Sequence, residues 1–296
     1  MKALITGGAG FIGSNLALEL EKEGNDVTVI DNLSSGNSKN LKDFKGNFIE
    51  MDVLKLNLKY NFDVVFHQAS VTDTTFKDDT EMLRQNINGF LEVIKFAKNK
   101  NAKLIYASSA GVYGNGKTPM KEDQKKQTLN AYAYSKCVMD GVAEKLFDKM
   151  FIIGLRYFNV FGPREAHKGR PASMVYHLAN QIKAGKNPRI FKMGEQKRDH
   201  IYIKDAVLAT IKAINAKSNI YNVGTGIATT FNELVKTLNE VLNTNLEPEY
   251  FDNPYEGTYQ NNTQADTQRA EKELNFKAEY SLKQGIKEYM EFLGYK

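Results

Sequence analysis

The chain has almost none of the features that cross-link a protein or anchor it in a membrane. It contains one cysteine, Cys137, among 296 residues, so no internal disulfide can form. That composition suits a reducing compartment. No uncharged apolar run approaches the roughly 20 residues that a membrane-spanning helix needs. The opening residues, KALITGG, lack the apolar core and cleavage site of a signal peptide. We therefore expect a cytoplasmic protein with no membrane partner.

An excess of charge of one sign is also missing. The 40 basic and 35 acidic residues leave a net charge of +5, and the two signs are interspersed along the chain. A nucleic-acid-binding protein usually shows a concentrated basic face, so we expect no nucleic-acid partner. No internal repeat, low-complexity tract or Pro/Gly-rich linker interrupts the chain. With 42% hydrophobic and 25% charged residues, the composition is that of an ordinary globular protein.

The order of the predicted elements is an alternation of apolar runs and amphipathic helices. Buried strands are predicted at 2–6, 26–30, 47–52, 62–69, 102–108 and 151–158. Helices are predicted at 11–24, 82–99, 132–149, 173–185, 203–215, 229–242 and 281–293, and short strands at 189–191 and 219–223. Strands that are apolar throughout and alternate with helices indicate an α/β fold, a doubly wound parallel sheet covered on both faces.

A glycine-rich segment, TGGAGFIG, joins the first strand to the first helix. Gly8, Gly10 and Gly13 satisfy the G-x-G-x-x-G pattern. These glycines permit a tight turn, close approach of the backbone to a pyrophosphate, and close helix–strand packing, while the helix N-terminus attracts the phosphates. The next strand ends at Asp31, 18 residues after Gly13 (31 − 13), near the spacing of about 20 expected for an acid that binds the adenosine ribose. We therefore predict a dinucleotide site.

The residues near Asp31 leave the identity of the dinucleotide open. Asp31 favours NAD, because its carboxylate would repel a 2′-phosphate, whereas Lys39 could neutralise that phosphate. The cofactor is thus NAD or NADP. Asp52 ends the third strand, where it could reach the adenine or simply cap a helix.

A possible catalytic set follows. YASSAGVYG ends a strand with Ser109, and AYAYSK opens a helix with Tyr132 and Lys136 four residues apart, on one helical face. A phenol with a pKa near 10 is a poor base. Lys136 could hold the nicotinamide ribose and lower the phenol pKa, and Ser109 could bind the same substrate oxygen.

With TGGAGFIG, FHQAS, YASSAGVYG, YAYSK, RYFNVFGPR and RDHIYIKDA in this order, the whole chain resembles the extended short-chain dehydrogenase/reductase family, the nucleotide-sugar epimerases and dehydratases. The resemblance implies a Rossmann domain over 1–165, joined by a segment near 200–225, and a smaller α/β nucleotide-sugar domain over 166–296. It also implies hydride transfer to a tightly bound NAD or NADP, no metal, and a homo-oligomer formed through the helices at 82–99 and 132–149. By this resemblance the cofactor site comprises Gly7, Gly8, Gly10, Phe11, Ile12, Gly13, Asp31, Asn32, Lys39, Asp52, Val53, Gln68, Ala69, Ser70, Asn86, Tyr132, Lys136 and Val160.

The residues beside the serine favour epimerisation within that family. Dehydratases carry an Asp-Glu pair where this chain has Ala110 and Gly111. A dehydrogenase that forms an acid needs a nucleophile, and Cys137 lies inside a helix, where cysteine usually serves as a small core residue. Epimerisation needs only removal of a hydroxyl proton and a hydride, followed by return of the hydride to the opposite face.

The charged stretch FNVFGPREAHKGRPASM, Phe158 to Met174, shows no strand or helix pattern. It resembles the ADP-glyceromanno-heptose 6-epimerases of the family, as does TYQNNTQAD near the C-terminus. The resemblance makes Lys168 a second acid/base group opposite Tyr132; the alternative is a lysine that binds the cofactor or the diphosphate. A basic lysine needs a lowered pKa, from burial or from cations such as Arg164, His167 and Arg170.

The substrate-side residues carried over by motif are Ser109, Asn159, Arg170, His177, Arg198 and Tyr259. The chain departs from the heptose pattern after Lys168, where Arg170 and Pro171 follow Gly169 in place of a serine. A UDP-glucose or UDP-N-acetylhexosamine 4-epimerase is therefore the alternative enzyme. A non-catalytic dinucleotide-sensing module is a third hypothesis, which the intact Ser109, Tyr132 and Lys136 oppose.

Overall fold

The centre of the molecule is a parallel sheet. The computed structural model describes residues 1–73, 76, 78–254 and 259–295. Within them, seven strands pair in the order β10-β6-β5-β4-β1-β2-β3, with every pairing parallel. They are β1 (Lys2–Thr6), β2 (Asp26–Asp31), β3 (Asn47–Glu50), β4 (Val64–His67), β5 (Lys103–Ser109), β6 (Ile152–Tyr157) and β10 (Asn219–Val223).

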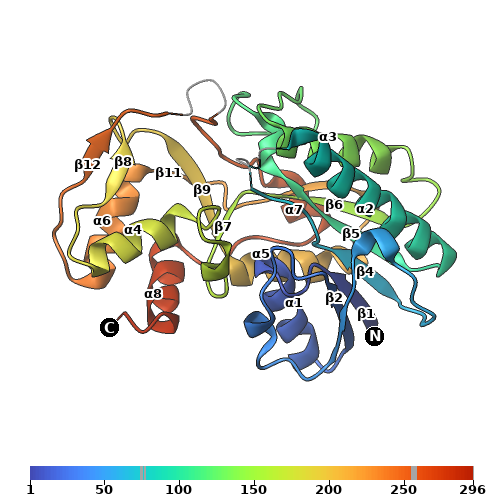
Figure 1. Cartoon of the computed structure of the whole chain (residues 1–296). Helices are drawn as coiled ribbons and strands as arrows, with labels where there is room; N and C mark the ends of the chain where they lie inside the picture. Colours follow the sequence, from blue (N-terminus) through green and yellow to red (C-terminus); the bar gives the residue numbers. More distant parts are fainter. Residues whose placement is uncertain (74–75, 77, 255–258, 296) are drawn as a thin grey trace.

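Both faces of this sheet are covered by helices. Successive side chains of a strand point to opposite faces, so a strand that is apolar throughout must bury both of them. Ala3 and Ile5 of β1 join one apolar cluster with α1 (Phe11–Lys22) and α5 (Ile203–Lys212). Leu4 joins a second cluster with α2 (Asp79–Asn99) and α3 (Ala131–Glu144). Figure 1 shows α2 and α3 on one side of the sheet and α1 and α5 on the other. The predicted doubly wound Rossmann sheet is confirmed.

The topology also places a ligand site. β1 lies inside the sheet, with β2 on one side and β4 on the other, so the strand order reverses there. In doubly wound sheets ligands bind in the crevice outside the carboxyl ends of the strands, at this reversal. The glycine segment follows β1 directly and therefore stands at its edge.

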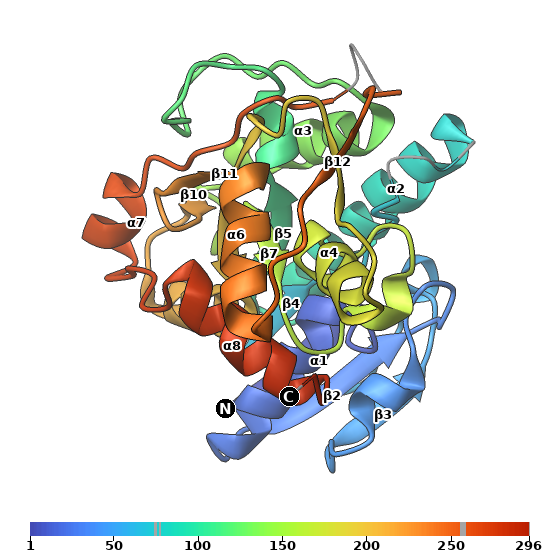
Figure 2. The same cartoon turned by 90° about the vertical axis from the view of Figure 1, so that its left-hand side faces the viewer.

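The second half of the chain adds smaller units beside the sheet. β7 (Asn159–Phe161) pairs in parallel with β9 (Lys197–Tyr202), which pairs antiparallel with β11 (Ala228–Thr230). A two-stranded ribbon joins β8 (Arg189–Phe191) to β12 (Glu249–Phe251). Figure 2 shows α4, α6 and α8 on this side of the molecule. The helices of this half are α4 (Met174–Lys183), α6 (Phe231–Leu242), α7 (Gln268–Glu273) and α8 (Leu282–Phe292).

Several predicted boundaries need correction. The stretch from Phe158 to Met174 was expected to be irregular, yet it contains β7 and a 3-10 turn at Ala166–Lys168. The helix predicted over 132–149 ends at Glu144. No helix among the described residues is long and apolar enough to cross a membrane.

Candidate active site

A cavity of about 920 Å³ opens at the carboxyl ends of the central strands and gathers most of the predicted site residues. Side chains from both halves of the chain line it, so it lies where the Rossmann sheet meets the later elements. Its predicted members are Gly7, Gly10, Phe11, Ile12, Gly13, Asp31, Asn32, Asp52, Val53, Gln68, Ala69, Ser70, Asn86, Ser109, Tyr132, Lys136, Asn159, Val160, Lys168, Arg198 and Tyr259.

The glycine segment adopts a turn that only glycine allows. Gly7 has a φ of +68°, and a Cβ there would lie 2.5 Å from the amide nitrogen of Ala69. A Cβ on Gly13 would lie 2.8 Å from the Cα of Gly8 and closer still to the carbonyl oxygen of Gly7. α1 therefore starts tightly against β1, at Phe11, and its free N–H groups face the cavity edge.

Asp31 reaches the same edge from the end of β2. Its carboxylate accepts hydrogen bonds from the backbone N–H groups of Ala9 (3.0 Å) and Leu33 (2.8 Å). Burial raises its pKa, and these two backbone bonds oppose the rise. The side chain of Asp52 also lines the cavity, while its Oδ1 caps the 3-10 turn that follows by accepting from Leu54. Lys39 is exposed and lies outside the cavity lining.

Two polar side chains behind the glycine segment, the buried His67 and the half-buried Gln68, each keep one buried atom without a partner among the described residues. These atoms are Nε2 of His67 and Oε1 of Gln68, although Nδ1 of His67 contacts Thr6 Oγ1 at 2.8 Å. Burial lowers the pKa of His67 to about 3, with the charge of Lys136 adding to the effect, so this ring is neutral. Together with the glycine turn and the Asp31 carboxylate, these groups fit a dinucleotide.

The serine, tyrosine and lysine meet in this cavity. α3 is capped by Asn130, whose side chain accepts from the N–H of Ala133 at 2.9 Å, and it carries Tyr132 and Lys136 on the face toward the cavity. The Nζ atom of Lys136 lies 5.7 Å from the centre of the Tyr132 ring and donates to the carbonyl oxygen of Ala107 at 2.9 Å.

Burial dominates the electrostatics of this set. It raises the pKa of the Tyr132 phenol, and the hydrogen bond with Ser109 opposes the rise. Burial also lowers the pKa of Lys136, to about 7. The phenol and the amine are both desolvated here, so each charged form depends on its immediate neighbours.

The loop that carries Lys168 is folded around a buried carboxylate. Glu165 accepts from the N–H of Gly162 (3.0 Å) and from the N–H (2.6 Å) and hydroxyl (2.8 Å) of Ser173. The Nζ atom of Lys168 lies 5.6 Å from the centre of the Phe11 ring. Burial lowers the pKa of Lys168 and the charge of Glu165 opposes this, so burial, one of the two predicted causes, produces the lowering.

The substrate side of the cavity is aromatic and basic. Arg198 lies between two rings, with its guanidinium carbon 4.6 Å from the centre of Tyr259 and 5.7 Å from that of Phe231. The side-chain oxygen of Asn159 accepts from the hydroxyl of Thr263 at 2.9 Å. The motifs did not reveal Phe231, which begins α6, because it reads as the first core residue of a helix.

A few predicted residues lie outside the cavity lining. Gly8 packs against Val29, and Arg170 is exposed. The Nε2 atom of His177 contacts the carbonyl oxygen of Arg170 at 3.1 Å, so this histidine braces the loop. Asn86 lines the cavity, but its amide is engaged with both backbone groups of Val71.

Comparisons with known proteins agree with this geometry. The sequence profile of the NAD dependent epimerase/dehydratase family matches residues 3–224. The ADP-L-glycero-D-manno-heptose-6-epimerase of Brachyspira hyodysenteriae is 39% identical to this chain, over 98% of it and 97% of the relative.

Solved structures extend the similarity to the whole fold. The crystal structure of the Helicobacter pylori ADP-L-glycero-D-manno-heptose-6-epimerase superposes with a TM-score of 0.93 at 40% identity, covering 99% of this chain and 96% of the other. The UDP-glucose 4-epimerase of Thermotoga maritima, solved with UDP-glucose, superposes with a TM-score of 0.92 at 29% identity, covering 99% of each chain.

Proposed function

The chain belongs to the NAD dependent epimerase/dehydratase family, and from that premise we propose that it epimerises a nucleotide sugar, ADP-glyceromanno-heptose, at C6 of the heptose. The reaction removes a hydroxyl proton and the hydride of the same carbon to form a keto-sugar, then returns the hydride to the opposite face of that carbon and a proton to its oxygen. The observation that carries the proposal is that Tyr132 and Lys168, from distant parts of the chain, line one cavity with the glycine turn.

We propose NAD as the cofactor. Gly7, Gly13 and the start of α1 would hold its pyrophosphate, and Asp31 its adenosine ribose. Bound there, the oxidised nicotinamide would supply the hydride acceptor and a positive charge beside the phenol. The Asp31 carboxylate lies at the cavity edge and Lys39 outside its lining, an arrangement that disfavours a 2′-phosphate.

The residues of the chain would manage the proton. Tyr132 would accept the hydroxyl proton at its Oη atom, with Ser109 hydrogen-bonded to the same substrate oxygen. Because burial raises the pKa of Tyr132, the phenolate needs nearby positive charge, which the Lys136 ammonium provides when it is protonated.

Lys168 would serve the second orientation of the sugar. In epimerisation through a ketone, the reacting oxygen of the sugar points in different directions in the substrate and in its epimer. One fixed tyrosine can reach this oxygen in both only if the whole sugar turns over. A second acid/base group removes that need. When Tyr132 accepts the proton in the oxidation, Lys168 would donate a proton to the ketone oxygen in the reduction from its ammonium form. In the reverse direction Lys168 would accept the proton, and burial, which lowers its pKa, favours the neutral amine that a base requires.

Lys168→Met tests this role. We expect kcat to fall by about 10²–10⁴, the usual contribution of a positioned acid or base, with unchanged cofactor content. Lys186→Met, at an exposed position after α4, is the matched control. Near-normal kcat with a raised KM, or with lost cofactor, would assign Lys168 to ligand binding instead.

A UDP-hexose 4-epimerase is the second candidate, favoured by the similarity to the Thermotoga maritima enzyme along the whole chain. Assays of the purified protein with ADP-glyceromanno-heptose, UDP-glucose and UDP-N-acetylglucosamine would separate the two. Turnover of a UDP-hexose without turnover of the heptose substrate would reject the main proposal. Inertness on all three would favour the non-catalytic module.

The cofactor and the assembly have their own tests. Denaturing the protein and identifying the released dinucleotide by mass spectrometry should give NAD, and NADP would overturn that part. We also propose that 1–165 bind the dinucleotide and 166–296 the sugar nucleotide. We propose that the chain self-associates through α2 and α3, where Leu91 and Tyr134 are 43% and 51% exposed; a monomer in sedimentation analysis would contradict this.

A further inference from the structure

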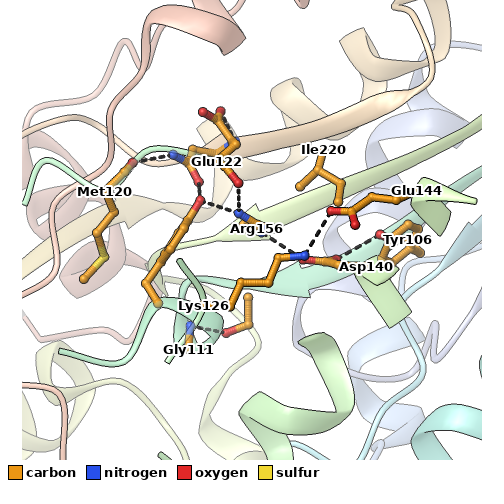
Figure 3. Close-up of polar contacts among 12 residues, drawn as sticks. Tyr106, Gly111, Met120, Glu122, Lys126, Asp140, Glu144, Arg156 and Ile220 are labelled. Atoms are coloured by element: carbon orange, nitrogen blue, oxygen red, sulfur yellow. Dashed lines mark hydrogen bonds and ion pairs between the residues drawn. The ribbon is translucent and has the colours of Figure 1, made fainter. Parts of the chain in front are cut away.

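A buried ion pair lies behind the tyrosine and lysine of α3. Asp140 and Arg156 are both fully buried, and the Nε atom of Arg156 on β6 donates to the Asp140 carboxylate at 2.8 Å. The hydroxyl of Tyr106 on β5 donates to the other oxygen at 2.9 Å. Figure 3 shows these contacts. A buried pair of this kind is weak evidence for stability, because desolvation offsets the attraction.

The pair is one helical turn from Lys136. Residues four apart share a helical face, so the Asp140 carboxylate is a near neighbour of the buried amine. Burial lowers the pKa of Lys136 to about 7, and the charge of Asp140 opposes that effect. The Lys136 amine also donates a hydrogen bond to the carbonyl oxygen of Ala107, but this oxygen carries no net charge.

Groups from every element packed around Lys136 bear on its charge. His67 on β4 is neutral because its pKa is lowered to about 3. Tyr132 on α3 and Tyr106 on β5 have pKa values raised by burial, so both phenols are neutral near pH 7. Asp140 therefore supplies the negative charge near the lysine, while Arg156 holds the carboxylate from the far side.

The same arginine also connects α3 to Tyr113 and Glu122, which follow β5 in the chain. Its Nη1 atom donates to the hydroxyl of Tyr113 (2.8 Å) and to the carbonyl oxygen of Glu122 (2.9 Å). Tyr113 donates in turn to Asn222 on β10 at 2.6 Å. The carboxylate is thus held directly from β5 and β6 and indirectly from β10, and it cannot move away from Lys136 without breaking this network.

We propose that Asp140 is a positioning residue of this site: its carboxylate, fixed by Arg156 and Tyr106, stabilises the ammonium form of Lys136 in the cavity. The inference rests on the proposed function in one respect, that the reaction needs this ammonium. It assigns to Asp140 a task in the reaction, through Lys136, rather than in holding the core together.

The test is Asp140→Asn, which keeps the size of the side chain and removes its charge. Without the carboxylate the pKa of Lys136 falls further, so the lysine loses its proton at a lower pH. In the pH profile of kcat, activity falls at high pH as Lys136 loses its proton. This alkaline limb should move to lower pH by about one unit or more in the variant, which should regain its activity when the pH is lowered. Glu144→Gln is the matched control: it removes a charge one turn further along α3, where Glu144 pairs with Lys126 at the surface.

A second readout does not depend on turnover. The titration of Lys136 can be followed by NMR of [ε-¹³C]lysine-labelled protein, with the resonance assigned by its loss in Lys136→Arg. Asp140→Asn leaves the buried guanidinium of Arg156 without its partner, which could prevent folding. In that case the double variant Asp140→Asn/Arg156→Met, which also removes the guanidinium, is used in its place. The midpoint should lie about one pH unit or more below that of the wild type in Asp140→Asn, and below it by a smaller amount in the double variant, which also loses a positive charge.

The two readouts separate the inference from the proposed function. An unchanged Lys136 midpoint in a folded variant would overturn the inference, even in an active enzyme. A shifted midpoint in a protein inert on the heptose substrate would support the effect of Asp140 on Lys136 and reject the proposed reaction. A shifted midpoint with an unshifted kcat profile would overturn the catalytic part of the inference.

Discussion

Gly13→Ala is the sharpest test of the dinucleotide site, because the structure gives the size of the perturbation. The added Cβ would lie 2.8 Å from the Cα of Gly8, 2.9 Å from the carbonyl carbon of Gly7 and closer still to its oxygen. All three are backbone atoms, which cannot turn away as a side chain can. To reach an ordinary contact of 3.4 Å, the start of α1 must move at least 0.6 Å from Gly8.

The magnitude follows from this displacement. The carbonyl contact requires a larger shift, so the total is on the order of 1 Å, and a misplacement of that size can reduce the rate about 10²-fold. Overpacking of this kind also costs about 1–3 kcal/mol of stability. Gly10→Ala is milder: its Cβ would lie 3.1 Å from the same carbonyl oxygen. Gly141→Ala, inside α3, meets no atom of the described residues within 4 Å and is the neutral control.

The assay measures cofactor content, kcat and thermal melting with and without added NAD. We expect cofactor content and kcat to rank Gly141→Ala above Gly10→Ala above Gly13→Ala, with Gly13→Ala losing most of its dinucleotide. A Gly13→Ala protein that retains wild-type cofactor content and kcat would refute the reasoning. Loss of cofactor in all three variants would show that the contacts do not set the order.

Two further predictions concern the reaction and the substrate. Tyr132→Phe should lower kcat by about 10²–10⁴ and leave cofactor content unchanged, because only the proton-accepting oxygen is removed; normal kcat would exclude this tyrosine as the base. Arg198→Met should raise KM for the nucleotide sugar about 10- to 100-fold, the loss expected for charge-assisted hydrogen bonds to a diphosphate. The control is Arg189→Met on β8, an exposed arginine paired with Glu249; equal effects of the two substitutions on KM would contradict the assignment of Arg198.

Elements with a simple burial pattern were predictable from the sequence. β1, β4 and β6 are buried on both faces, so they appear as continuous apolar runs. β9 was not predicted, because Arg198, Asp199 and His200 follow one another in it and all three are buried. A strand with that composition forms only because the tertiary structure provides partners, such as the four backbone and hydroxyl donors that Asp199 accepts from.

The candidate site also has a part that the sequence predicted and a part that it did not. The glycine turn with Asp31, and the spacing of Tyr132 and Lys136, depend on neighbours close in the sequence, so local patterns predicted them. The loop of Lys168 was predicted to be irregular, since its conformation comes from the buried Glu165 rather than from a repeating pattern.

By itself, the sequence determined the doubly wound sheet and the glycine turn, since these follow from periodicity and short-range spacing, while the ordered motifs, by their resemblance to a family, predicted a nucleotide-sugar epimerase and its site residues. Only the tertiary structure decided which charges are desolvated together. Burial raises the pKa of Tyr132 and lowers the pKa values of Lys136 and Lys168. For Tyr132, the sequence had predicted only that Lys136 could lower the pKa. It also brought Arg156 of β6 against Asp140 of α3, because the side chains that surround a buried charge come from elements far apart in the chain.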